Sequence, residues 1–115
     1  MASWVNISLG QYLTVDIMNA IYNNFVYLSE KMAADGIQVP DLENNTVSYE
    51  ISPADILAKF NAVEHNIDIL HTLVEYSDEY YETAFVWTED MYLPEYLRNG
   101  VSRWINWLNC AKENL

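Results

Sequence analysis

The chain has 115 residues, of which 51% are hydrophobic, and this length suits one domain built around a single core. Seventeen acidic residues against five basic ones give a formal net charge of −12, which argues strongly against direct binding to nucleic acid. The sequence has no apolar run near the ~20 residues of a membrane span and no signal-peptide pattern. The lone Cys110 cannot close an intramolecular disulfide, which excludes a secreted disulfide scaffold and favours an intracellular environment. Together these features lead us to expect a protein that is neither secreted nor inserted in a membrane.

The first predicted element is a helix over residues 15–34. Its apolar residues recur in steps of three and four, which places them on one side of a helix: Met18, Ile21, Phe25, Leu28 and Met32. Thr14 is a suitable N-cap, and Gly36 can adopt the left-handed conformation that ends a helix. These signals predict both ends of the helix.

Residues 37–51 lack a helical period. Val47, Tyr49 and Ile51 alternate with polar residues, as in a strand, and residues 41–45 favour a turn. This connector is therefore compatible with a short strand or β-hairpin.

The second helix is predicted to begin at Pro53. Ser52 is its N-cap, and Asp55 completes a capping-box-like pattern three residues later. The apolar stripe then follows alternating steps of four and three: Ile56, Phe60, Val63, Ile67, Leu70 and Val74. We expect the helix to span residues 53–75, with an extension to about Tyr81.

The third helix is predicted to start near Pro94, after a non-helical connector over residues 82–93. Its stripe consists of Leu97, Val101, Trp104, Leu108 and Ala111, and Gly100 is a weak point within it. Together the three segments predict an all-α protein, a three-helix bundle with a short β-hairpin in the 37–51 connector.

The three helices share a pattern, N-[AG]-[IV]-x-x-[NW]-[FI]-x-x-L, which starts at Asn19, Asn61 and Asn99. Asparagine has poor helix propensity because its side chain competes for backbone hydrogen bonds. Three at one register suggest a common task, such as bonding to the backbone of the preceding loop, although chance similarity is the alternative. Internal repeats of this kind favour stacking and self-association. Within the single domain of residues 1–115, the repeats cover about 4–36, 52–81 and 87–115.

The second repeat, Asn61-Ala62-Val63-Glu64-His65-Asn66-Ile67, resembles a segment found in small phage and prophage virion proteins of tail or head–tail type. That segment has a Trp, an acidic or Gly turn, an aromatic residue and then N-R-[IV]-E-x-N-[IL]-x-x-L, and it often occurs twice. The stretch of residues 86–90, Val-Trp-Thr-Glu-Asp, is similar to its opening turn. Here Ala or Gly replaces the Arg, and the first and third repeats lack the Glu. The resemblance implies a viral structural or accessory protein and carries over no catalytic residue.

Candidate chemical sites are few. Glu64, Asp68 and His71 follow the i, i+4, i+7 spacing of one helical face, but the apolar stripe predicts that this face is solvated rather than metal-binding. Cys110 is interpreted as a small hydrophobic residue, and three glycines form no phosphate-binding loop. We expect no catalytic, cofactor or metal residues and no enzymatic activity.

Aromatic and acidic residues provide a better indication of function. Nine of the sixteen aromatic residues lie in the last 40 positions, which is more than a small core can bury. Trp107 lies on the flank of the third stripe. Residues 41–95 hold thirteen acidic residues against Lys59, whereas residues 96–115 have a net charge of +2, so an electrostatically directed contact is expected within the chain or with a partner. The candidate contact residues are Tyr80, Tyr81, Trp87, Trp107, Asp78, Glu79, Glu82, Glu89 and Asp90.

These observations lead to a non-enzymatic phage structural or virion-associated protein as the first hypothesis. It would bind protein partners, either other copies of itself or other virion proteins, in the virion or in the host cytoplasm. An alternative is an acidic inhibitor that imitates nucleic acid in a basic groove, as anti-defence proteins of phages do. A bacterial helical adaptor is a further alternative with the same surface chemistry.

Overall fold

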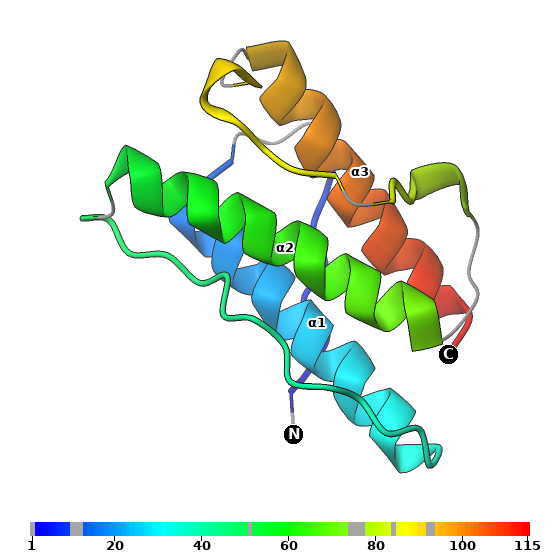
Figure 1. Cartoon of the computed structure of the whole chain (residues 1–115). Coiled ribbons are helices and arrows are strands. Elements are labelled where there is room, and N and C mark those ends of the chain that lie inside the picture. The colour runs from blue at the N-terminus through cyan, green and yellow to red at the C-terminus, as the bar shows by residue number, and fades with distance from the viewer. Residues whose placement is uncertain (1, 10–12, 51, 74–77, 84, 92–93) are drawn as a thin grey trace.

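The computed structural model describes residues 2–9, 13–50, 52–73, 78–83, 85–91 and 94–115, without the side chains of Pro53, Asp78 and residues 94–98. It contains three α-helices, which are α1 (Val15–Ala34), α2 (Pro53–Leu73) and α3 (Pro94–Glu113). Two short 3-10 turns, η1 (Asp78–Tyr80) and η2 (Glu89–Met91), lie between α2 and α3. The predicted all-α three-helix bundle is confirmed, with α2 crossing in front of α1 and α3 beside both (Figure 1).

Helix α1 has the predicted ends. The hydroxyl oxygen of Thr14 accepts a hydrogen bond from the Ile17 amide at 3.1 Å, which satisfies one free N–H of the first turn. At the other end Gly36 has φ +85°, and the Ile37 amide donates to the Met32 carbonyl at 2.9 Å. This pair of features is a Schellman ending, in which glycine reverses the chain without steric cost.

Helix α2 starts as predicted, and the predicted extension to Tyr81 is not observed. Ser52 accepts from the Asp55 amide at 3.3 Å, and its hydroxyl donates to the Asp55 carboxylate at 2.8 Å. The described helix ends at Leu73, and residues 74–77 lie outside the described residues. The predicted extension to Tyr81 is wrong, because η1 forms a 3-10 turn and Tyr81 follows it without helical structure.

The core joins the three predicted apolar stripes. Phe25 and Leu28 of α1 and Val63 and Leu70 of α2 have no exposed surface. Trp104 and Trp107 of α3 also have none, and Trp87 of the connector is only 2% exposed. A tryptophan from a non-helical segment therefore completes the core.

Gly100 is required by the packing of Trp87. The Trp87 ring lies edge-on to the rings of Phe60 and Trp104, with centroid distances of 5.4 and 5.7 Å. A Cβ atom at Gly100 would overlap Cζ2 and Cη2 of Trp87. The glycine that is a weak point for helix propensity thus allows the indole to approach the helix backbone.

We expect Gly100→Ala to destabilise the protein by up to about 2 kcal/mol, because an overpacking cost of about 1–3 kcal/mol at an enclosed ring is only partly offset by the ~1 kcal/mol gain in helix propensity. Urea unfolding monitored by circular dichroism measures the change. In a double variant with Trp87→Phe the added penalty of the alanine should shrink, because a smaller ring leaves room for Cβ. An alanine variant as stable as the parent protein would contradict this account of Gly100.

Candidate functional site

Four asparagine side chains in the described structure each bond to both backbone groups of one residue in a non-helical segment. The side-chain oxygen accepts from the N–H of that residue, and the side-chain NH₂ donates to its carbonyl oxygen. We call each such pair of bonds an amide clamp. The clamps join Asn19 to Val47 at 2.9 and 3.4 Å, Asn24 to Val5 at 2.9 and 2.9 Å, Asn61 to Trp87 at 2.7 and 3.3 Å, and Asn66 to Glu43 at 2.8 and 2.8 Å.

An amide clamp supplies what a neighbouring strand would supply. In an antiparallel pair, two residues exchange both N–H···O bonds, and here a side-chain amide takes the place of one of the two residues. The predicted hairpin in the 37–51 connector is therefore wrong. Over residues 37–50 the chain forms no strand and instead runs along the helices, bonded to Asn19 and Asn66 (Figure 1).

The clamps follow the sequence repeat. In α1 and in α2 two asparagines stand five positions apart, and the first of each pair holds the segment that follows its helix. The second, Asn24 or Asn66, holds the segment that precedes its helix. The backbone role predicted for Asn19 and Asn61 is confirmed, but the predicted direction is wrong, since both bond to the following connector.

The third repeat departs from this arrangement. Asn99 is exposed on α3, and its side chain makes no hydrogen bond to any described residue. Trp104 occupies the position of the second asparagine and is fully buried. Of the three repeat asparagines, Asn99 alone does not form a clamp in the described structure.

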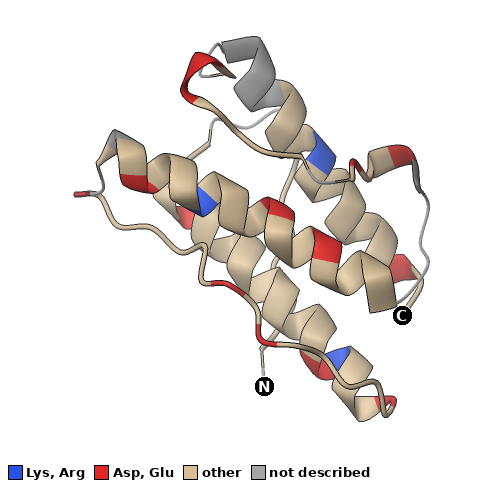
Figure 2. Ribbon diagram, in the orientation of Figure 1, with Lys and Arg blue, Asp and Glu red and all other residues tan. Residues whose placement is uncertain are grey.

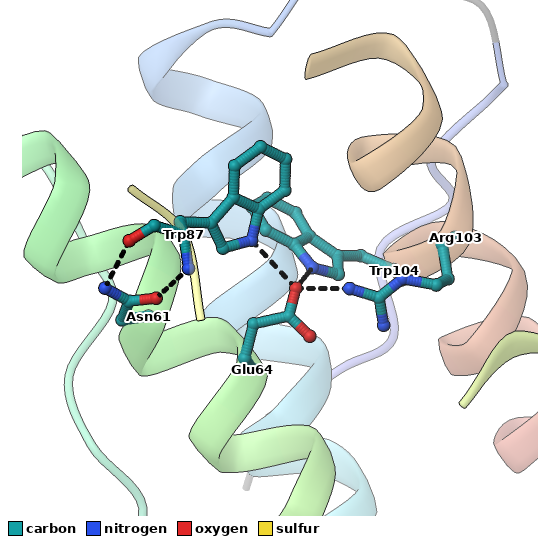
Figure 3. A network of polar contacts seen from close by, with 5 residues as sticks. All are labelled: Asn61, Glu64, Trp87, Arg103 and Trp104. Atoms are coloured by element: carbon teal, nitrogen blue, oxygen red, sulfur yellow. Dashed lines mark hydrogen bonds and ion pairs between the residues drawn. The ribbon is translucent and has the colours of Figure 1, made fainter. Parts of the chain in front are cut away.

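Glu64 is the centre of a buried polar network (Figure 3). Its Oε2 atom accepts hydrogen bonds from the indole N–H of Trp87 at 2.9 Å and of Trp104 at 2.7 Å, and it forms an ion pair with Arg103. The carboxylate is 4% exposed, so the predicted solvated face is wrong for this residue. The apolar stripe identifies only one side of α2, whereas the 85–88 segment and α3 cover a second side.

Arg103 balances the buried carboxylate. Its guanidinium lies 5.2 Å from the centre of the Phe85 ring, while its Nη1 atom is buried and has no hydrogen-bond partner among the described residues. The electrostatic contact predicted between the acidic middle of the chain and its cationic C-terminal segment is thus made, in part, within the chain. Among the described residues no three His, Cys, Asp or Glu side chains are arranged to hold a metal ion.

Burial contradicts part of the predicted contact surface. Trp87 and Trp107 are buried, and the exposure expected of Trp107 is wrong because η1 packs against α3. The Trp107 indole N–H donates to His71 Nδ1 at 3.3 Å, and the His71 ring stacks on Tyr81 with a centroid distance of 3.8 Å. Tyr80 and Tyr81 are half-buried and pack against the core.

The acidic part of the predicted contact surface is exposed but divided. Glu79, Glu82, Glu89 and Asp90 are all exposed, and the side chain of Asp78 lies outside the described residues. The two short turns that carry most of these residues, η1 and η2, lie apart in the molecule (Figure 2). The predicted acidic residues therefore form two small groups rather than one continuous surface.

Asp90 belongs to a local turn. The Thr88 hydroxyl donates to the Asp90 carboxylate at 2.8 Å, and this hydrogen bond, followed by one from the Asp90 backbone, holds the pKa of Asp90 below the ordinary 3.8. In Thr88→Ala we expect the pKa of Asp90 to rise toward its ordinary value. Titration of the Asp90 carboxyl carbon by NMR measures this, and an unchanged midpoint would contradict the role of Thr88.

No family model matches the chain, and no curated protein or solved structure matches it significantly. In the described part of the chain, no helix combines the length and the apolar character needed to cross a membrane.

Proposed function

We propose that this protein is a non-enzymatic structural or virion-associated phage protein that acts through protein–protein contacts, including contacts between its own copies. One observation carries the proposal: the buried polar side chains hold the chain's own segments in place. Glu64 bonds two indoles and Arg103, and the four clamp asparagines bond connector backbones. The resemblance of the second repeat to virion proteins supports the phage context.

Light scattering during size exclusion tests this proposal. At ~0.1–0.5 mM protein in 0.15 M salt, we expect a mass above the 13.4 kDa of one chain. Matched runs at low concentration and at high salt separate specific association from charge effects, because a net charge of −12 makes copies repel most strongly at low salt. A strict monomer throughout this range would contradict self-association.

The exposed carboxylates of Glu79, Glu82, Glu89 and Asp90 favour a second candidate, an acidic inhibitor that occupies a basic groove of a nuclease or polymerase. Such binding should weaken steeply with salt, because exposed charges are screened over ~4 Å at 0.5 M. Binding that survives 0.5 M salt would contradict mimicry of nucleic acid. A bacterial helical adaptor would share the contact chemistry of the first proposal and differ in its host.

A further inference from the structure

Asn99 on α3 forms no amide clamp in the described structure, and the N-terminal segment of the same chain has a position at which a clamp is missing. The 37–50 connector is held at two points four residues apart, at Glu43 by Asn66 and at Val47 by Asn19. Residues four apart in an extended segment point to the same side, so one face of the connector meets two helices. Asn66, the second clamp asparagine of α2, and Asn19, the first clamp asparagine of α1, thus hold the same connector.

The N-terminal segment has the first of these two points and lacks the second. Asn24 holds Val5 through both backbone groups at 2.9 Å. Four residues further on, Leu9 is 52% exposed, and its N–H and carbonyl make no hydrogen bond to any residue that the structure describes. Leu9 stands in a turn at the end of the described segment, and its spacing from Val5 equals that of Val47 from Glu43, so it is the residue that matches the position held by Asn19.

Asn99 is the asparagine that begins the third repeat, and in the described structure it holds no non-helical segment. It stands at the register of Asn19 and Asn61, it is exposed, and it is unbonded in the described structure. We propose that Asn99 of one copy closes an amide clamp on Leu9 of a second copy. This inference rests on the proposed self-association and names the residues that would make it.

The distribution of charge favours this pair of surfaces. The chain carries a net charge of −12, so two copies repel over most of their surfaces. Residues 1–15 contain no charged side chain, and residues 96–115 have a net charge of +2. Arg103 in this stretch is already paired with Glu64, so these two regions are the least acidic parts of the chain, and their approach meets the least repulsion. The exposed Leu9 side chain, and that of Val5 at 42% exposure, provide apolar surface beside the clamp.

Two copies related by a two-fold axis make the contact twice and form a closed dimer. Made once per pair, the contact is head-to-tail: one copy keeps a free Leu9 and the other a free Asn99, so a third copy can add. Such an interface closes into a ring or continues as a filament, depending on the rotation between copies.

Two variants test the clamp with matched controls. Asn99→Ala removes the side-chain amide, and Asn109→Ala makes the same change at another exposed asparagine of α3. Leu9→Pro removes the backbone N–H, whereas Leu9→Ala shortens the side chain and keeps the N–H. Asn99→Ala loses both hydrogen bonds of the clamp, so we expect it to raise the self-association Kd about 10–30-fold. Leu9→Pro loses the bond to the N–H alone, so we expect a rise of about 3–10-fold, and both controls should associate more tightly than the variant they match.

A mixing experiment separates the clamp from general damage to the fold. Asn99→Ala copies retain Leu9, and Leu9→Pro copies retain Asn99, so each lacks a different half of the contact. We expect each variant to remain monomeric alone and the two to form a 1:1 dimer when mixed, as seen by sedimentation velocity. Circular dichroism and thermal unfolding of each variant verify that it is folded.

The outcomes distinguish this inference from the proposed function. If the parent protein associates and both variants associate equally well, the Asn99–Leu9 clamp is wrong while self-association stands. If the parent is a strict monomer, self-association and the clamp between copies are both wrong. If the variants change only the unfolding midpoint of a monomer, the clamp closes within one chain and the contact between copies is overturned.

Discussion

Glu64→Ala should destabilise the fold by about 3–5 kcal/mol, the usual cost of removing one partner of a buried ion pair. The substitution leaves the Arg103 guanidinium without its counter-charge, and it removes the acceptor of two buried indole N–H groups. Urea unfolding measures the loss, and fluorescence reports directly on the site because Trp87 and Trp104 both bond to the missing carboxylate.

Two variants control for this result. Asp68→Ala removes a half-buried carboxylate one turn further along α2, and we expect it to cost less than about 1 kcal/mol. Glu64→Gln retains an oxygen acceptor but not the charge, so its cost should fall between the two. If Glu64→Ala were as stable as Asp68→Ala, the network would not be a major source of stability.

Asn66→Ala should cost about 2–4 kcal/mol. The Asn66 side chain is fully buried, holds both backbone groups of Glu43 and donates to the Asn45 side-chain oxygen at 3.2 Å. Truncation leaves these groups without this partner in a buried to partly buried site, and each unsatisfied group costs about 1–3 kcal/mol before relaxation. Denaturant unfolding gives the difference from the parent protein.

Asn66→Asp is the sharper form of the same test. A carboxylate accepts from the Glu43 N–H but cannot donate to the Glu43 carbonyl or to Asn45, so oxygen atoms face one another in a buried site. We expect this variant to be at least as unstable as Asn66→Ala at neutral pH. Asn109→Ala provides the baseline for an exposed asparagine, and equal stability of Asn66→Ala and Asn109→Ala would refute the clamp as a stabilising element.

The helices could be predicted from sequence because their signals are local. Thr14, Gly36 and Ser52 act within four residues along the chain, and the observed caps use those residues. The shared register of Asn19 and Asn61 also predicted a structural role, because asparagine is unfavourable inside a helix. Their actual partners lie 26–28 residues later in the chain, and no local pattern identifies them.

The burial of Glu64, Trp87 and Trp107 could not be predicted from the same signals. A helical stripe marks one buried face, but α2 is covered on a second side by α3 and by a connector that carries Trp87. A carboxylate there becomes favourable only through Arg103 and two indole N–H groups brought from distant segments. Gly100 was the available sequence signal, because an unfavoured residue in a helix often marks a close approach.

The amide clamps also affect hydrogen exchange. Backbone amides outside helices and sheets usually exchange quickly with solvent, but those of Val5, Glu43, Val47 and Trp87 are each bonded to an asparagine of a packed helix. Each of these protons can exchange only when its own segment lifts from the bundle. The four exchange rates would therefore give separate opening free energies for the N-terminal segment and for the two connectors, within an otherwise helical protein.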